Sequence, residues 1–291
     1  METTELLKKV RKIEIRTKGL VNQIFSGEYH SVFKGRGMTF SEVREYQFGD
    51  DIRLIDWNVS ARFNHPYVKI FEEERELTVM MLVDVSGSGE FGTVQQLKRD
   101  IATELCAVLA FSAIQNNDKV GVILFSDVIE KFIPPKKGRT HILRIVRELL
   151  DFTPAHRGTD VTEGLRYLTS AIKKRSIAFL ISDFLGSGYD DALKIAARKH
   201  DLIGVHLYDP REVELPPAGL IRVRDAETGE AIWIDTGDRM VRDGYSRWWI
   251  QQQETRKKLF LRCGVDAVEI RSDQSYIQPL ISFFRAREKR W

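Results

Sequence analysis

Four short runs of almost purely apolar residues, separated by longer segments with helical periodicity, constrain the fold of this chain more than any other feature. The runs are LTVMMLVDV (77–85), VGVILF (120–125), IAFLIS (177–182) and LIGVHLY (202–208). A strand that is apolar on both sides must be covered on both faces, which is typical of parallel sheets. The sequence therefore predicts an α/β fold, a doubly wound and mostly parallel sheet flanked by helices.

The other elements of this domain follow from the same patterns. Apolar residues that recur with a period near 3.6 predict helices over residues 93–116, 139–151, 161–174, 189–199, 239–262 and 276–288. Shorter strands are expected at 129–133, at an edge of the sheet, and at 265–270. With these elements, residues 77–291 make one main domain.

Two regions depart from this rhythm. Before the main domain, residues 3–25 have the pattern of an amphipathic helix, 26–66 are expected to be irregular, and 67–73 are extended. Inside it, the insert at about 210–237 opens with prolines and predicts a hairpin around Glu227-Thr228-Gly229-Glu230. We expect residues 1–76 and the insert to form a smaller, partly β subdomain.

The composition indicates which cellular compartment and which classes of partner to expect. The 45 Lys and Arg residues nearly balance the 42 Asp and Glu residues, so neither nucleic acid nor an anionic membrane is expected as the main partner. The two cysteines lie in apolar helical patterns and give no disulfide framework. We find no signal peptide and no apolar run of transmembrane length, and we expect a cytoplasmic protein.

Oxygen-bearing side chains stand where predicted strands end or helices begin. Asp84, Ser86 and Ser88 alternate in a glycine-containing loop after the first buried run. Thr159 precedes a predicted helix, and Asp183 follows the run at 177–182. Ligand sites of open α/β sheets lie outside the carboxyl ends of the strands, so these five residues are the candidate site. Asp160, beside Thr159, is expected to cap its helix.

The chemistry of these five side chains favours a hard cation. Hydroxyls and carboxylates without His or Cys suit Mg²⁺, which prefers six oxygen ligands and keeps several waters when protein ligands are few. Mn²⁺ and Ca²⁺ remain possible. Two carboxylates balance the charge of such an ion and leave a coordination position that an Asp or Glu of a partner protein could fill.

The loop of Asp84, Ser86 and Ser88, together with Thr159 and Asp183, resembles the metal-ion-dependent adhesion site of von Willebrand factor A domains. In that family these positions hold the ion directly or through water. The resemblance implies a von Willebrand factor A-like fold, a bound metal and a role in protein–protein interaction. It does not imply an enzyme.

A second resemblance covers nearly the whole chain. It rests on Gly35-Arg36-Gly37, Arg44-Glu45-Tyr46, Gly49-Asp50-Asp51-Ile52-Arg53, Ile55-Asp56-Trp57 and Ser60-Ala61-Arg62. These segments look like the part that precedes the adhesion-type domain in the bacterial domain-of-unknown-function 58 family. The resemblance implies a MoxR-type AAA+ ATPase as a partner and a chaperone-like role in assembling or maturing other proteins.

Three other interpretations of these residues stay open. Gly87-x-Gly89-x-x-Gly92 matches a dinucleotide-binding fingerprint, although Asp84 and Glu90 would place negative charge against a pyrophosphate. Asp84, Ser86 and Ser88 could instead only cap a helix and shape a turn. The chain could also be a scaffold whose metal site is vestigial.

The charged residues at 44–62 have two interpretations, a salt-bridged network within the protein or part of a partner surface. Trp57 lies among them and favours the packed, salt-bridged network.

Overall fold

The computed structural model describes residues 10–11, 13–14, 37–74, 77–93 and 96–290. The chain divides into two compact units, residues 33–77 and a larger unit that contains residues 78–291 and the described residues near the N-terminus. Most of the helix predicted at 3–25 lies outside the described residues, although residues 10–11 and 13–14 are helical.

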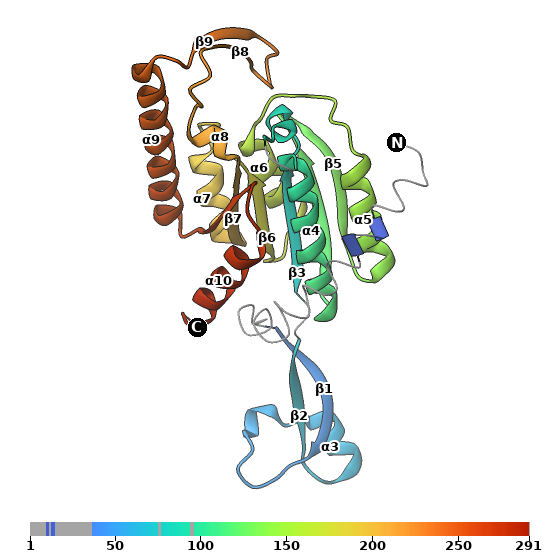
Figure 1. The fold of residues 1–291 in the computed structure, drawn as a ribbon. Coiled ribbons are helices and arrows are strands. Elements are labelled where there is room, and N and C mark those ends of the chain that lie inside the picture. The colour runs from blue at the N-terminus through green and yellow to red at the C-terminus, as the bar shows by residue number, and fades with distance from the viewer. Residues whose placement is uncertain (1–9, 12, 15–36, 75–76, 94–95, 291) are drawn as a thin grey trace. The chain divides into compact units, whose positions relative to one another are not determined.

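A six-stranded sheet forms the centre of the larger unit, in the order β10-β7-β6-β3-β4-β5 (Figure 1). Its strands are β3 (Thr78–Asp84), β4 (Lys119–Phe125), β5 (Ile129–Lys136), β6 (Ile177–Ser182), β7 (Asp201–Tyr208) and β10 (Asp266–Arg271). All neighbours pair in parallel except β4 and β5. The predicted doubly wound, mostly parallel sheet is therefore confirmed.

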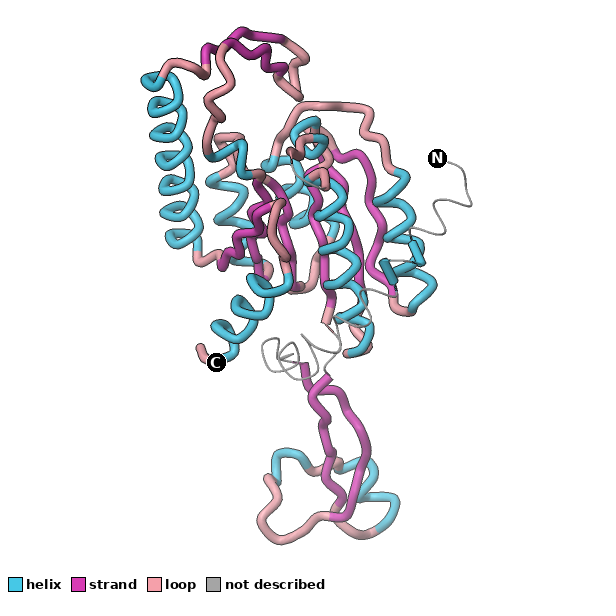
Figure 2. The backbone as a smooth tube through the Cα atoms, in the orientation of Figure 1, coloured by secondary structure: helices cyan, strands magenta, loops and turns pink. Residues whose placement is uncertain are grey.

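Helices cover both faces of this sheet, which explains why the central strands are apolar throughout. On one face α4 (Lys98–Gln115) packs beside α5 (Arg139–Asp151), and on the other α6 (Val161–Ala171) packs beside α7 (Asp190–Lys199) (Figure 2). Side chains of β3 and β4 join those of α6, α7 and the long helix α9 (Arg239–Cys263) in a buried core. The last helix, α10 (Ile277–Glu288), contacts β10.

Three predicted elements need corrected boundaries. The helix predicted from residue 93 begins at Lys98, because the amide and hydroxyl of Thr93 donate to Asp209 instead of joining a helix. The helix predicted over 161–174 ends at Ala171. The edge strand runs beyond residue 133 to Lys136, since prolines are tolerated on an edge strand.

The predicted hairpin forms from β8 (Leu220–Arg224) and β9 (Ala231–Asp235), preceded by the short helix α8 (Pro210–Val213). It is a separate two-stranded sheet of the larger unit. The expectation that this hairpin and the N-terminal segment build one subdomain is therefore wrong. The described residues at 37–74 form their own hairpin, β1 (Gly37–Glu45) with β2 (Tyr67–Glu74).

The smaller unit is more regular than its glycines suggested. Residues 26–66 were expected to be irregular, but β1 and the helices η1 (Ile52–Leu54) and α3 (Trp57–Phe63) lie within them. Arg44 forms a bidentate ion pair with Asp50, at 2.7 and 2.8 Å, which supports the salt-bridged interpretation of this segment. Trp57 does not pack as expected, since 71% of it is exposed.

The helices of the described residues include none that combines the length and apolar character needed to cross a bilayer. The longest, α9, carries charged residues along its whole length.

Candidate functional site

The candidate site lies where the chain reverses its direction of travel across the sheet. From β3 the chain proceeds through α4 to β4 on one side, and later strands add on the other side, beginning with β6. Asp84 is the last residue of β3, and Asp183 follows β6, its direct parallel neighbour. The carboxyl ends of two such strands border the crevice in which open α/β sheets bind ligands. The topology thus brings together two carboxylates that are 99 positions apart in the sequence.

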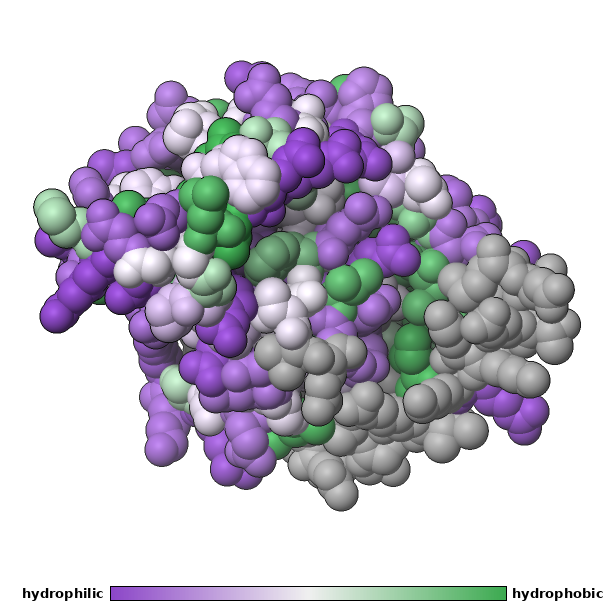
Figure 3. Space-filling view, turned by 45° about the horizontal axis from the view of Figure 1, so that its top comes forward, coloured by the Kyte–Doolittle hydropathy of each residue, from purple (hydrophilic) through white to green (hydrophobic). Residues whose placement is uncertain are grey.

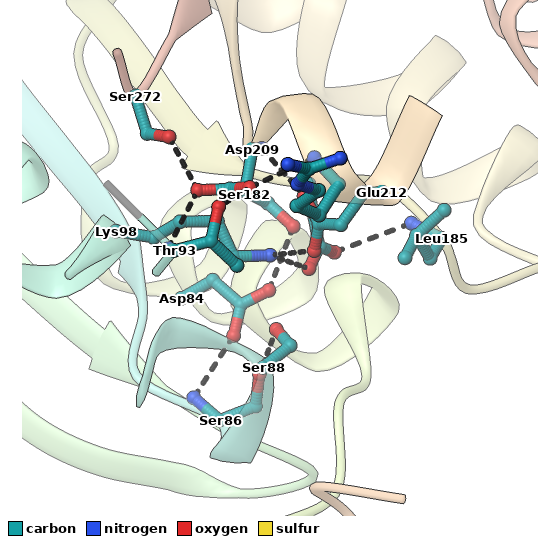
Figure 4. A network of polar contacts seen from close by, with 12 residues as sticks. Asp84, Ser86, Ser88, Thr93, Lys98, Ser182, Leu185, Asp209, Glu212 and Ser272 are labelled. Atoms are coloured by element: carbon teal, nitrogen blue, oxygen red, sulfur yellow. Dashed lines mark hydrogen bonds and ion pairs between the residues drawn. The ribbon is translucent and has the colours of Figure 1, made fainter. Parts of the chain in front are cut away.

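Asp84 organises the turn that follows β3. One carboxylate oxygen accepts the Ser86 amide at 3.0 Å, and the other accepts the Ser182 hydroxyl at 2.7 Å. Ser86 Oγ and Ser88 Oγ lie 3.1 Å apart. The residues from Gly87 to Glu90 form a single 3-10 turn that the Ser86 side chain does not cap. The carboxylate therefore shapes the turn, as the capping interpretation requires, but the serine hydroxyls face each other (Figure 4).

A buried lysine stands beside the second carboxylate. Lys98 Nζ lies 2.9 Å from Asp183 Oδ2 and 2.5 Å from Glu212 Oε1 (Figure 4). Lys98 is only 3% exposed and Asp183 only 6% exposed, so solvent screens this ion pair little. Glu212 comes from α8, where it forms a capping box with the buried Asp209. The insert therefore contributes a charged group to the candidate site.

The two carboxylates differ in how readily they ionise. Burial and the nearby charge of Asp183 together raise the pKa of Asp84 to about 6. Burial would also raise the pKa of Asp183, but the charge of Lys98 and the hydrogen bonds from Lys98, Ser88 and the Leu185 amide together outweigh it and lower the pKa. Burial also raises the pKa of Glu212, although Lys98 opposes this rise. Lys98 is thus a single ammonium beside three carboxyl groups, those of Asp84, Asp183 and Glu212.

Thr159 is placed near the turn but not in contact with its carboxylates. The loop that carries Thr159 is tied to the turn by a hydrogen bond from the Gly87 amide to the Arg157 carbonyl, at 2.9 Å. The Thr159 hydroxyl donates to Glu227 Oε1 of the β8–β9 hairpin, at 2.6 Å. Asp160 caps α6 as predicted, since its side chain accepts the Thr162 amide. The structure therefore gathers Asp84, Ser86, Ser88 and Asp183 into one network, and Thr159 lies in an adjoining loop.

The residues at this site fit a single small cation. A cavity of about 20 Å³, lined by Asp84, Ser88, Lys98 and Asp183 among others, has room for one water-sized body. The lining also includes Arg99, and the side-chain oxygens of Asp84, Ser88 and Asp183 are of the kind that a divalent ion prefers. Among the described residues no group of three or more His, Cys, Asp or Glu side chains is arranged to hold a metal. A cation here would therefore depend on the serine hydroxyls and on water for most of its ligands.

The glycine motif in the same loop lacks the geometry of a dinucleotide site. That fingerprint needs a helix N-terminus at the glycines, where free amides meet the pyrophosphate. Here α4 begins at Lys98, six residues after Gly92. A Cβ on Gly87 would lie 2.2 Å from the Ala226 carbonyl oxygen, so this glycine accommodates the hairpin. The nucleotide interpretation therefore has no structural support from these glycines.

Four polar residues of the site were not predicted from the sequence. They are Ser182, Lys98, Glu212 and Glu227, which reach the five candidates from other elements. Lys98 lies in the first turn of α4, where the helix dipole disfavours positive charge, but the helix predicted from residue 93 placed it a turn further along. The sequence around Glu212 and Glu227 gave no signal either, although the Glu212 side chain is only 12% exposed.

Comparison with known proteins places the chain among relatives. An uncharacterized protein of Mycobacterium tuberculosis is 28% identical over 292 residues, covering 99% of this chain and 92% of that protein. The crystal structure of the conserved hypothetical protein BatB from Bacteroides thetaiotaomicron covers 73% of this chain and 99% of its own, with 18% identity and a TM-score of 0.48. The SpRpn10 VWA domain covers 71% of this chain and 94% of its own, with 10% identity and a TM-score of 0.43.

A protein-family model extends over most of the chain. The family described as "Protein of unknown function DUF58" matches residues 42–255, which include the smaller unit from within β1 onward, all five candidate residues and the insert. The chain therefore belongs to this family.

Proposed function

We propose that this protein is a docking module for other proteins, and that its docking site holds one divalent cation at Asp84, Ser86, Ser88, Thr159 and Asp183. Mg²⁺ is the proposed ion, with Mn²⁺ or Ca²⁺ as alternatives. The single observation that carries the proposal is the pair of carboxyl groups at the carboxyl ends of β3 and β6, which share one buried lysine with Glu212. Such an ion would supply a vacant coordination position for a carboxylate of the partner.

The surroundings of the site support docking better than catalysis. Polar groups of the network are hydrogen-bonded to one another, and no His, Cys or second carboxylate pair in the described site is arranged as a nucleophile with its base. Two large apolar side chains near the site, Phe91 and Leu185, are each 39% exposed. In Figure 3, which brings this end of the molecule forward, apolar residues lie among hydrophilic ones. We therefore propose a non-catalytic role.

We propose a MoxR-type AAA+ ATPase as the partner, with a chaperone-like role in the assembly or maturation of other proteins in the cytoplasm. This part of the proposal rests on the resemblance to the family and on no contact within the chain. The chemistry of the site sets one requirement for any partner, an exposed Asp or Glu side chain that can enter a shallow, polar site.

The proposal is tested by capturing partners from native bacterial lysate. We expect the wild-type chain to retain a partner in Mg²⁺ and to lose it in EDTA, because the ion bridges the two proteins. Asp183→Ala should retain about tenfold less partner in Mg²⁺ than wild type, which corresponds to roughly 1.4 kcal/mol. Capture would be quantified by mass spectrometry. Asp235→Ala, which removes an exposed carboxylate of the hairpin, is the control.

Capture that is equal in Mg²⁺ and EDTA, and equal for wild type and Asp183→Ala, would contradict metal-dependent docking. That result would favour the scaffold interpretation, in which the metal site is vestigial.

A further inference from the structure

The tip of the β8–β9 hairpin carries a carboxylate to the edge of the docking site. Glu227 Oε1 accepts the hydrogen bond of the Thr159 hydroxyl at 2.6 Å, although the two residues are 68 positions apart. A hydroxyl donating to a carboxylate is among the stronger hydrogen bonds in proteins. Of the five candidate residues, Thr159 is thus the one whose side chain contacts a carboxylate of the hairpin.

Backbone packing holds the hairpin tip against the same loop. The Gly87 Cα lies so close to the Ala226 carbonyl that an added Cβ would stand 2.2 Å from its oxygen. Such an approach is possible only for glycine. The tip therefore meets the site twice, once through Ala226 on the serine-containing turn and once through Glu227 on Thr159.

The tip is built to present Glu227. Asp225 Oδ1 accepts the amides of Glu227 and Thr228 at 2.8 and 3.0 Å, which fixes the turn locally. Gly229 completes the turn with a φ of 75°, a conformation that glycine adopts readily. The backbone position of Glu227 is therefore set by its own loop.

The strands behind the tip are weakly held. β8 and β9 pair only with each other among the described strands, and most of their residues are exposed or half-exposed. Two-stranded hairpins are marginally stable in water. The base is firmer, since Thr236 bonds to Gly219 through both its amide and its hydroxyl, each at 2.8 Å. The contacts that hold the base are therefore separate from those that hold the tip.

Given the proposed function, on which this inference rests, we propose that Glu227 is an internal ligand of the docking site. It takes the position that a carboxylate of a partner takes once the hairpin tip has moved away. The hairpin thereby competes with partners and sets a threshold for docking. The contact with Thr159 belongs to the closed form, and the partner-bound form is open at the tip.

The test compares Glu227→Gln with Glu230→Gln, an equal change of charge on an exposed side chain of the same hairpin. Hydrogen–deuterium exchange in EDTA reports on the tip without metal. Titration with acetate in saturating Mg²⁺, followed by NMR, reports on the docking position. We expect Glu227→Gln to exchange about fivefold faster at residues 220–235 and to bind acetate about fivefold more tightly, because a neutral amide oxygen accepts the Thr159 hydroxyl more weakly than a carboxylate does.

Gly87→Ala provides a second route to the open form. Its methyl group collides with Ala226 and displaces the tip while Glu227 keeps its charge, so it should reproduce both effects of Glu227→Gln. Glu230→Gln should match wild type in both measurements.

The outcomes of these measurements distinguish a failure of the internal-ligand role from a failure of the proposed docking function. If acetate binds only with Mg²⁺ but Glu227→Gln behaves like Glu230→Gln in both measurements, the internal ligand is excluded and the docking site stands. If no variant binds acetate in Mg²⁺, the docking function itself fails and the ligand role fails with it, even where exchange is faster in Glu227→Gln.

Discussion

Lys98→Met is expected to lower the free energy of unfolding by about 3–5 kcal/mol in the absence of a divalent cation. The substitution keeps the length and much of the volume of the side chain but removes its charge. Asp183 and Glu212 then lose the ammonium that lies 2.9 and 2.5 Å from them. Removing one partner of a buried ion pair is strongly destabilising because a charge stays buried without compensation. Urea denaturation in EDTA at neutral pH measures the effect.

Two further variants show whether charge is the cause. Arg99→Met removes the neighbouring cation, whose side chain is half exposed, and should change stability by less than about 1 kcal/mol. Adding Glu212→Gln to Lys98→Met removes one of the two uncompensated charges and should recover part of the loss. If Lys98→Met were no more destabilising than Arg99→Met, the ion pair with Asp183 would not form as described.

Asp84→Asn is expected to have the opposite effect and to stabilise the metal-free protein at pH 8. The pKa of Asp84 is raised from 3.8 to about 6, so the folded protein favours the protonated carboxyl. The wild type gains from this preference below pH 4 and loses the gain as the pH rises through 6. Asparagine is neutral at every pH and escapes that loss. The difference should grow from near zero at pH 4 to at most about 3 kcal/mol at pH 8.

Thermal unfolding of both proteins in EDTA between pH 4 and pH 8 gives this difference directly. Asp160→Asn is the control, because Asp160 serves as a helix cap and asparagine caps nearly as well. A wild type that is more stable than Asp84→Asn at pH 8 would show that the ionised carboxylate stabilises the fold by more than its burial destabilises it. If Asp84→Asn is more stable than wild type at pH 8, the Asp84 carboxylate lowers the stability of the metal-free protein.

Much of the fold could be predicted because its central strands are apolar on both sides. IAFLIS and LIGVHLY can only be strands buried between two layers, and both were placed to within a residue. The C-terminal end of α9 could also be predicted, because Gly264 follows the helix in the sequence. In the structure this glycine adopts a φ of 69°, the left-handed conformation that commonly ends helices. Local patterns of this kind depend on neighbouring residues and need no knowledge of the tertiary structure.

The boundaries that failed depend on distant partners. Residues 93–97 have helical periodicity, but Thr93 is drawn out of the helix by Asp209, which lies 116 positions further along the chain. Trp57 was expected to pack because tryptophan usually does, and its exposure follows from a small unit with few apolar partners. Neither effect is visible in a window of nearby residues.

The candidate site could be predicted only in part, because some of its residues follow recognisable strands and others come from distant segments. Asp84 and Asp183 could be found because each follows a recognisable strand, and parallel strands end at one edge of a sheet. Lys98, Glu212 and Glu227 could not be assigned to the site from the sequence. Glu212 and Glu227 come from the insert, whose position relative to the sheet is not predicted by local sequence patterns. Their presence changes the chemistry, since the site contains its own cation and its own additional carboxylates.

The most direct test of the proposed site is a measurement of Mn²⁺ binding by electron paramagnetic resonance, with wild type and Asp84→Asn compared at pH 8. Mn²⁺ stands in for Mg²⁺ and gives a signal that distinguishes free from bound ion. We predict one bound ion per wild-type chain, competition by Mg²⁺, and at least tenfold weaker binding to Asp84→Asn. Absence of bound Mn²⁺ at millimolar concentration, or equal binding by the two proteins, would contradict a cation held between the ends of β3 and β6.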